Sequence, residues 1–123
     1  IPSGYEVAID GARVFTGMDA IEWARRAEGL GAGEIVVNSI DRDGTGRGYE
    51  LDLTGEIARA VTVPVIASGG AGTVQHIMDG FDAGASAAII SSMLYSPRNR
   101  NVSVPELKEE LLAAGANVRP LVA

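Results

Sequence analysis

The sequence contains no cysteine and a single histidine, His76, among its 123 residues. The absence of cysteine excludes a disulfide framework and any metal site built from thiolates. One imidazole argues against a zinc site that needs several histidines. We therefore expect no metal and no cofactor.

Basic patches and long apolar runs are missing as well. The formal net charge is −6, and no basic cluster interleaved with aromatic residues is present, which argues against nucleic acid as a partner. No apolar run approaches the roughly 18 residues that a membrane-spanning helix needs, and no signal-peptide pattern is visible. The sequence thus predicts a cytoplasmic protein with no membrane partner.

The stretch from 63 to 72 reads VPVIASGGAG and is the most informative part of the chain. An apolar run ends in small residues and glycines, and a helical pattern begins at Thr73. Backbone N–H groups and the positive end of a helix dipole would converge at this turn, which suits a phosphate group. A glycine turn alone is weak evidence, because many such turns only make a tight connection from strand to helix.

The remaining apolar patterns predict an N-terminal β-hairpin followed by alternating strands and helices. The hairpin covers 5–15, with its turn at Asp10-Gly11. The predicted strands are 34–38, 64–68 and 87–90; the predicted helices are 18–28, 51–60, 73–83 and 105–114, with a short helical turn at 92–95. Trp23 and Phe81 fall at apolar helix positions and are expected to be packing residues rather than a platform for a substrate.

Three strand–helix units, starting near 34, 64 and 87, indicate the α/β class with a parallel sheet. The strands are continuous apolar runs, which is typical of strands buried on both faces. The glycine pattern is not a dinucleotide-binding fingerprint. We therefore favour a segment of a (β/α)8 barrel over an open doubly wound sheet. Such barrels need roughly 200 residues or more, so residues 1–123 are expected to form one domain equal to about half of a barrel.

Polar residues and glycines follow each predicted strand, and in a barrel these strand ends share the face that carries the active site. Backbone N–H groups of Gly44, Gly70 and Ser92 and the hydroxyl of Ser91 or Ser92 are candidate phosphate donors, although a serine here also suits a helix N-cap. Asp41 is a candidate acid, base or hydroxyl-orienting group. The candidate binding residues are Asn38, Asp41, Asp43, Gly44, Ser68, Gly69, Gly70, Ser91 and Ser92.

Two further polar residues admit ordinary structural explanations. Asp43 precedes a glycine, so it either orders its loop or lies beside the phosphate. The remaining ligands of a calcium loop are missing around Asp41 and Asp43, so calcium is not expected. His76 falls inside the helix after the second parallel strand and is expected to be a partly exposed helix residue away from the strand end.

These motifs together resemble the cyclase subunit family of imidazole glycerol phosphate synthase. The resemblance covers nearly the whole chain and corresponds to the C-terminal half of that family's barrel. The segments that carry it are PSGYEV at 2–7, TGMDAIEWA at 16–24, GAGEI at 31–35, NSIDRDGT at 38–45, GY at 48–49 and PVIASGGAG at 64–72.

The resemblance implies a histidine-biosynthesis lyase in which a glutaminase partner supplies ammonia. The ammonia adds to a phosphoribulosyl formimino nucleotide, and cyclisation and cleavage follow. It also implies a phosphate site at Asp43, Gly44, Gly70, Ser91 and Ser92, in a pocket lined by Asp41 and Ser68. Asn38 stands where many family members have threonine.

The family's two catalytic aspartates lie at the ends of strands one and five of the barrel. The run VAID at 7–10 looks like strand five, but the ungapped match of its neighbours places it in the hairpin after that strand. Asp10 is then a turn residue, and both catalytic aspartates are expected to be missing. The chain alone is therefore expected to be inactive.

Three parallel strands of a half-barrel expose two unpaired edges and an apolar inner face. This exposure favours association, either with a second copy of the chain or with a complementary half. The ligand expected from these residues is a phosphorylated sugar or nucleotide, or inorganic phosphate. Other interpretations are a non-catalytic phosphate-binding module that assembles with itself, and a cyclase-like relative that serves sugar amidination in surface polysaccharide synthesis. The sugar-phosphate isomerase of the same pathway fits less well.

Overall fold

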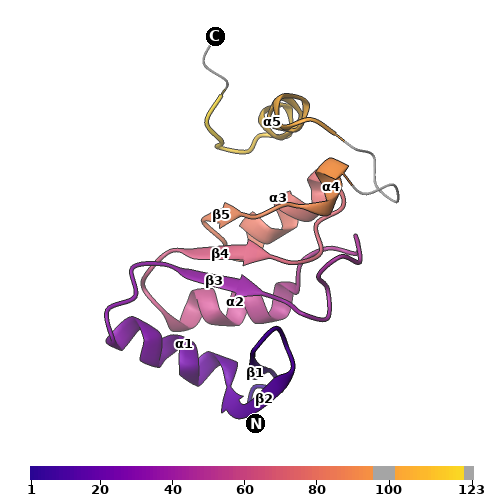
Figure 1. Cartoon of the computed structure of the whole chain (residues 1–123). Helices are drawn as coiled ribbons and strands as arrows, with labels where there is room; N and C mark the ends of the chain where they lie inside the picture. The colour runs from indigo at the N-terminus through magenta and orange to yellow at the C-terminus, as the bar shows by residue number, and fades with distance from the viewer. Residues whose placement is uncertain (96–101, 121–123) are drawn as a thin grey trace.

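A small parallel sheet forms the centre of the molecule, with a hairpin at one end and the last helix at the other (Figure 1). The computed structural model describes residues 1–95 and 102–120. The strands are β1 (Glu6–Ile9), β2 (Val14–Asp19), β3 (Ile35–Asn38), β4 (Val65–Ser68) and β5 (Ala87–Ala88); the helices are α1 (Ala20–Gly29), α2 (Leu51–Ala60), α3 (Val74–Ala83), α4 (Ser92–Tyr95) and α5 (Val104–Ala113).

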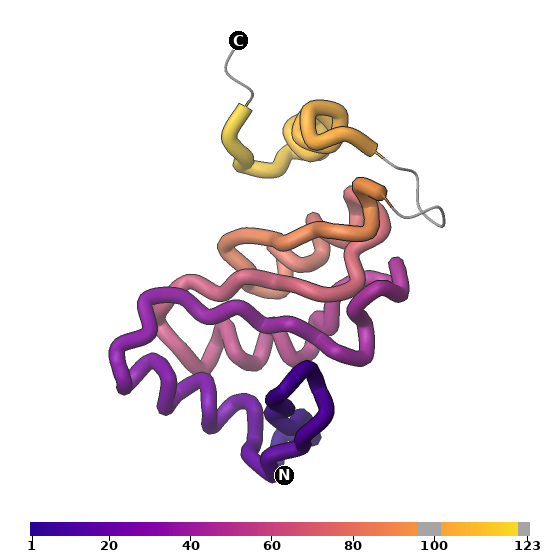
Figure 2. Tube along the Cα trace, in the orientation of Figure 1, coloured from indigo at the N-terminus to yellow at the C-terminus, as the bar shows by residue number. Residues whose placement is uncertain are grey.

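The sheet has the order β3-β4-β5, and both strand pairs are parallel. Val36 lies opposite Ile66, which in turn lies opposite Ala87. The trace in Figure 2 shows each of the first two sheet strands followed by a helix that returns the chain to the start of the next strand. The prediction of the α/β class with a parallel sheet is confirmed, and the sheet is not a closed barrel.

The hairpin turn runs from Asp10 to Arg13, so it contains the predicted pair Asp10-Gly11, and the N–H of Arg13 donates to the carbonyl of Asp10. Its two central residues are Gly11 and Ala12, whose positive φ angles of 63° and 69° match the twist of paired strands. β2 continues to Asp19, so the predicted strand end at 15 and helix start at 18 were wrong. The Asp19 carboxylate accepts hydrogen bonds from the backbone of Ile21 and Glu22, which places the helix start after it.

Asp19 also joins the hairpin to α1, because its carboxylate accepts a hydrogen bond of 2.7 Å from the backbone N–H of Ser3. These bonds lower the pKa of Asp19 below its usual value, with the contact to Ser3 as the main cause.

The bounds of the parallel strands differ less from the prediction. β5 contains two residues where four were expected, although the N–H of Ile89 still donates to the carbonyl of Ala67 at 2.8 Å.

Two apolar clusters cover one face of the sheet. The first joins α1 and α2 to that face and includes Val37 and Val65. The second joins the sheet to α3, α4 and α5 and includes Ala67, Ile77 and Leu107. Phe81 packs against this second cluster, as predicted, whereas Trp23 is 38% exposed and belongs to neither cluster.

The other face of the sheet is open. Val36 is 52% exposed and Ile89 is 44% exposed, whereas Val37 and Ala67 on the covered face are buried. The expectation that these strands are buried on both faces was therefore wrong for this chain by itself. In a closed barrel the open face would turn inward, and its residues would pack against those of the remaining strands.

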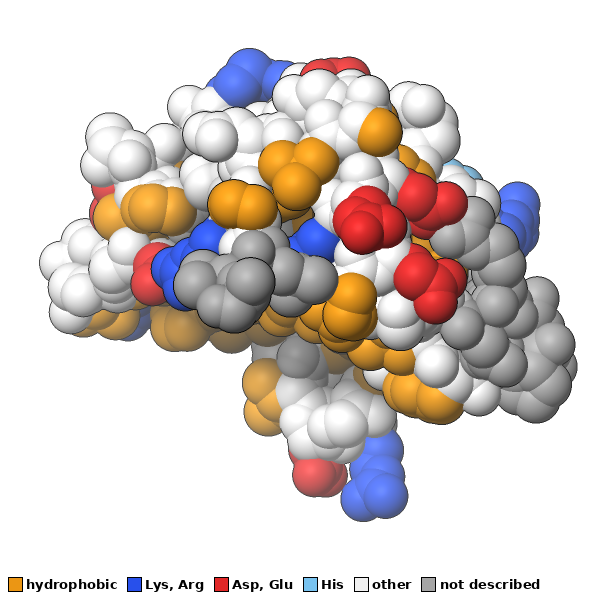
Figure 3. Space-filling model, turned by 90° about the horizontal axis from the view of Figure 1, so that it is seen from above, with side chains coloured by type: hydrophobic (Ala, Val, Ile, Leu, Met, Phe, Trp, Pro, Cys, Tyr) orange, Lys and Arg blue, Asp and Glu red, His pale blue; other side chains and the backbone are white. Residues whose placement is uncertain are grey.

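The outer surface around α5 is mixed in character. Glu106 and Glu109 of this helix are exposed. Figure 3 looks down on this end of the molecule and shows acidic side chains gathered beside separate hydrophobic ones. Among the described residues, no helix has the length and apolar character that crossing a membrane requires.

Tyr49 connects the loop before α2 to the segment that follows β5. Its side chain is 2% exposed, and its hydroxyl donates a hydrogen bond of 2.8 Å to the carbonyl of Ile89. Burial raises the pKa of Tyr49 to about 12. The ring lies so close to α3 that a Cβ on Gly80 would meet it at 3.0 Å.

We expect Tyr49→Phe to lower the free energy of unfolding by about 1 kcal/mol, because the partly buried hydrogen bond to the carbonyl of Ile89 is lost. The same change at the exposed Tyr95 is the control and should have little effect. In the parent chain, stability should fall as the pH rises from about 10 to about 12, because the folded state keeps Tyr49 protonated. Urea unfolding at several pH values measures both effects. Equal losses in the two variants would contradict the role of Tyr49.

Candidate functional site

Seven of the nine predicted binding residues line one small pocket of about 90 Å³ at the carboxyl ends of the parallel strands. We call it the glycine pocket. It is far smaller than the roughly 300 Å³ or more that a drug-sized ligand occupies, and its size suits a small anion. Three loops line it: Asp43 and Gly44 after β3; Ser68, Gly69, Gly70 and Ala71 after β4; and Ile89, Ile90, Ser91, Ser92 and Tyr95 after β5.

Backbone packing brings the first two loops together. The N–H of Gly48 donates to the carbonyl of Gly70 at 2.8 Å. Gly70 has a φ of 115°, and a Cβ at this position would lie 2.1 Å from the carbonyl oxygen of Gly48. Since no real Cβ approaches an oxygen this closely, only glycine allows the two loops to meet here.

Two backbone N–H groups at the start of α3 donate to side chains of the same segment. The hydroxyl of Thr73 accepts a hydrogen bond from the backbone N–H of His76, and Nδ1 of His76 accepts one of 3.0 Å from the N–H of Gly72. The expectation that unpaired N–H groups converge after β4 therefore needs correction at Gly72, whose donor has an internal partner. His76 also lies beside the turn, so its predicted place away from the strand end was wrong.

The hydroxyl groups of the pocket have defined neighbours. Oγ of Ser91 lies 2.6 Å from the hydroxyl oxygen of Tyr95. One of the two hydroxyl groups donates its hydrogen to the other, and the hydrogen of the accepting hydroxyl remains able to donate to a bound oxygen. Ser68 donates to Oδ1 of Asn38 at 2.9 Å, so its own hydrogen is committed while the amide NH₂ of Asn38 still offers two donors.

The two remaining predicted residues, Asn38 and Asp41, line a different recess of about 580 Å³. We call it the hairpin recess, because it lies between the hairpin and the free edge of β3 and also includes Trp23. The hydrogen bond between Ser68 and Asn38 connects it to the glycine pocket. Asp10 lies in the hairpin turn, as predicted, and lines neither cavity.

The hairpin recess also contains a carboxylate that sequence reasoning missed. Glu50 accepts a hydrogen bond of 3.1 Å from the hydroxyl of Tyr5, and its other oxygen lies 3.8 Å from Nε of Arg42. Burial and this hydrogen bond raise the pKa of Tyr5. The hydrogen bond between Tyr5 and Glu50 joins residues 45 positions apart in sequence, and no local pattern could have shown it.

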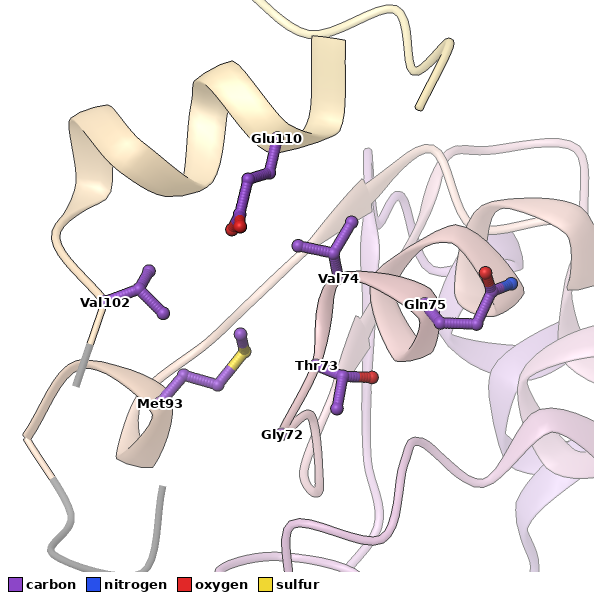
Figure 4. A pocket seen from close by; sticks show the side chains of 7 residues that line it. All are labelled: Gly72, Thr73, Val74, Gln75, Met93, Val102 and Glu110. Carbon is purple, nitrogen blue, oxygen red and sulfur yellow. The ribbon is translucent and has the colours of Figure 1, made fainter. Parts of the chain in front are cut away.

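A further recess of about 450 Å³ lies between the start of α3 and the helices α4 and α5 (Figure 4). Val74, Met93 and Val102 point toward it, and Glu110 reaches into it from α5. None of the predicted site residues lines this recess. Within the part of the chain that is described, no three histidine, aspartate or glutamate side chains lie close enough together to hold a metal ion.

Comparison with known families now assigns the chain. Residues 2–99 match the family described as "Histidine biosynthesis protein". The chain belongs to the histidine biosynthesis protein family. Imidazole glycerol phosphate synthase subunit HisF of Nitratidesulfovibrio vulgaris is 54% identical over 120 residues, which are 97% of this chain and 45% of that relative. HisF of Synechococcus sp. is 48% identical over 122 residues, which are 95% of this chain and 46% of that relative.

The resemblance to the cyclase subunit is thus confirmed, and the chain spans about half the length of these curated relatives. Among solved structures, the Amycolatopsis orientalis BexX/CysO complex has a TM-score of 0.64 at 23% identity, over 84% of this chain and 44% of that one. N-acetylmannosamine-6-phosphate 2-epimerase from Clostridium perfringens has a TM-score of 0.51 at 18% identity, over 76% and 39% of the two chains. At these identities the likeness concerns the fold alone, which fits a segment of a TIM barrel.

The contact between Gly48 and Gly70 predicts a large difference between two glycine substitutions. Gly70→Ala places a Cβ against backbone, so we expect a loss of at least about 2 kcal/mol in the free energy of unfolding. Gly44→Ala is the matched control, because its φ of 76° is also positive but its Cβ would meet nothing within 4 Å. This second change should cost only the conformational strain of about 1 kcal/mol.

Chemical denaturation of both variants measures the difference. If the two alanine variants unfold at the same denaturant concentration, the close approach of the two loops is not a stabilising constraint. A Gly70 substitution is accordingly a test of folding, and the binding of an anion needs a different variant.

Proposed function

We propose that the glycine pocket binds a phosphate group, and that the chain supplies the C-terminal half of an imidazole glycerol phosphate synthase cyclase subunit. The observation that carries the proposal is the convergence of three strand-end loops, with their glycines and hydroxyls, on one pocket of anion size. Identity of about 50% to HisF proteins over nearly the whole chain supports the same reading.

In this proposal the pocket holds one phosphate of a phosphoribulosyl formimino nucleotide. Backbone N–H groups of the turns, together with the hydroxyl pair of Ser91 and Tyr95, supply donors to its oxygens. Asn38 and Asp41 face the neighbouring hairpin recess and would contact the remainder of the substrate. A glutaminase partner would supply the ammonia for cyclisation and cleavage, and the reaction would take place in the cytoplasm.

We further propose that this chain does not catalyse the reaction by itself. The aspartate that resembles a catalytic residue in sequence, Asp10, stands in an exposed hairpin turn. The glycine pocket offers Asp43 and the hairpin recess offers Asp41 and Glu50. Loss of a positioned acid or base costs about 10² to 10⁴ in rate, so a pair absent from the site would leave little turnover.

The open face of the sheet supports association with another half-barrel. Val36 and Ile89 are exposed on this face, and among the described strands β3 and β5 each pair with β4 only. Unpaired strand edges and an apolar face favour a partner that covers them. The complementary half of the barrel would cover this surface, and a second copy of the chain is the alternative.

Phosphate binding can be tested with one added charge in two places. We expect Ser91→Asp to weaken binding of inorganic phosphate at least about fivefold, because a carboxylate within about 4 Å of the anion repels it by roughly 1 to 4 kcal/mol. Ser86→Asp adds the same charge next to the opposite end of β5 and is the matched control. Calorimetric titration of the parent and both variants gives the affinities. Equal weakening in the two variants, or no binding to the parent, would contradict the phosphate site.

Light scattering of the purified chain, with and without phosphate, tests the association. We expect a discrete species of at least two copies when the chain is alone, because the open face needs cover. Adding a polypeptide that corresponds to the N-terminal half of a HisF relative should convert it to a one-to-one complex, in which ammonia-dependent turnover can be sought. A monodisperse monomer with a stable folded signal would rule out the need for a partner.

A further inference from the structure

His76 connects the two loops whose contact shapes the glycine pocket. Its Nδ1 accepts the hydrogen bond from the N–H of Gly72, immediately after the glycine turn. Its ring lies against the loop after β3, where a Cβ on Gly48 would meet the ring carbon Cδ2 at 3.3 Å. Gly48 is the residue whose N–H bonds to the carbonyl of Gly70. One half-buried imidazole therefore bonds to the turn after β4 at Gly72 and lies beside the loop after β3 at Gly48.

The arrangement is a variant of the capping box found at helix starts. In that motif the N-cap hydroxyl accepts from the backbone three residues later, and the side chain at the third helical position reaches back to a backbone N–H. Thr73 and His76 occupy these two positions. A glutamate would keep its acceptor at any pH near neutrality, whereas an imidazole loses the acceptor at Nδ1 when that nitrogen takes up a proton.

We propose that His76 is a positioning residue whose neutral imidazole holds the joint between the two loops closed, so that protonation of its ring weakens anion binding in the glycine pocket. The inference rests on the proposed phosphate site and adds its dependence on pH. Protonation would set an Nδ1–H against the N–H of Gly72, so the two donors repel and the turn after β4 moves away from the ring. The helix start would then lose the bond that fixes the glycine turn.

The direction in which the affinity changes with pH tests the proposal, because the charge on the ring and the loss of its hydrogen bond have opposite effects on anion binding. Arg42, Arg47, Asp52 and Asp79 line a recess of about 250 Å³ together with His76. A positive charge on His76 would by itself attract an anion, through solvent and salt that screen charges beyond about 8 Å at physiological ionic strength. Loss of the hydrogen bond acts in the opposite direction. Stronger anion binding at low pH would therefore contradict the proposal.

The experiment uses sulfate as the probe, because it stays a dianion across the pH range in which phosphate itself titrates. In 0.15 M salt, between pH 8 and pH 5.5, we expect the affinity of the parent chain for sulfate to fall about three- to tenfold, which corresponds to one hydrogen bond of ordinary net strength. His76 is the single histidine of the chain, so its imidazole signal in NMR of the untagged protein reports protonation without overlap. The protection factor of the Gly72 amide, which compares its exchange rate with the intrinsic rate at the same pH, should fall over the same range.

Two variants separate the proposal from a general structural role. In His76→Asn the amide oxygen stands where Nδ1 stood and accepts at every pH, so sulfate binding should become independent of pH while Arg42, Arg47, Asp52 and Asp79 remain. In His76→Phe the ring is kept without an acceptor, so the affinity should stay at the low value at every pH. If either variant is unfolded, the amide exchange of Gly72 in the parent still tests the bond.

The outcomes distinguish the two proposals. An unchanged pH dependence in His76→Asn would overturn the role of His76 and leave the phosphate site in place. Absence of sulfate binding to the parent at any pH would overturn the phosphate site. In that case Gly72 exchange that follows the protonation of His76 would still establish the joint.

Discussion

The contact between the backbone of Gly48 and that of Gly70 is the constraint on which the rest of the candidate site depends. A Cβ at position 70 would lie 2.1 Å from the carbonyl oxygen of Gly48. Because both partners are backbone, neither can turn aside as a flexible side chain would. The loop after β3 and the turn after β4 can meet only in this way, and their meeting creates one wall of the glycine pocket.

Neighbouring residues extend this contact to the third loop. Tyr49 follows Gly48 directly and carries its hydroxyl to the carbonyl of Ile89, just before the serines at the end of β5. The side chain of His76 lies beside Gly48 and accepts a hydrogen bond from the N–H of Gly72. Two consecutive residues, Gly48 and Tyr49, thus bond the loop after β3 to both of the other loops of the pocket. Packing that stabilises the fold and geometry that shapes the pocket come from the same contacts.

The sheet itself combines strong local order with an unfinished surface. On one face Val37, Val65 and Ala67 are buried beneath helices. On the other face Val36 and Ile89 are exposed beside the polar pair of Asn38 and Ser68. The same residues would point into the interior of a closed barrel, where layers of side chains fill the space. The exposed apolar face and the adjoining polar site are therefore parts of the same surface of the sheet.

Local patterns in the sequence determined the strand–helix order, the hairpin turn and the residues that end the strands, because periodicity, glycines and caps act over a few positions. The α2 range was predicted correctly, whereas the start of α1 was missed because the Asp19 cap was not recognised. The grouping of Gly70 with Ser91 was expected from the sequence, whereas tertiary structure alone decided the hydrogen bonds of Ser68 with Asn38 and of Tyr5 with Glu50. It also decided the place of His76, although the pairing of Thr73 with a residue three positions later was a visible signal. These contacts join distant segments, and only the packed backbone brings such segments within hydrogen-bonding distance.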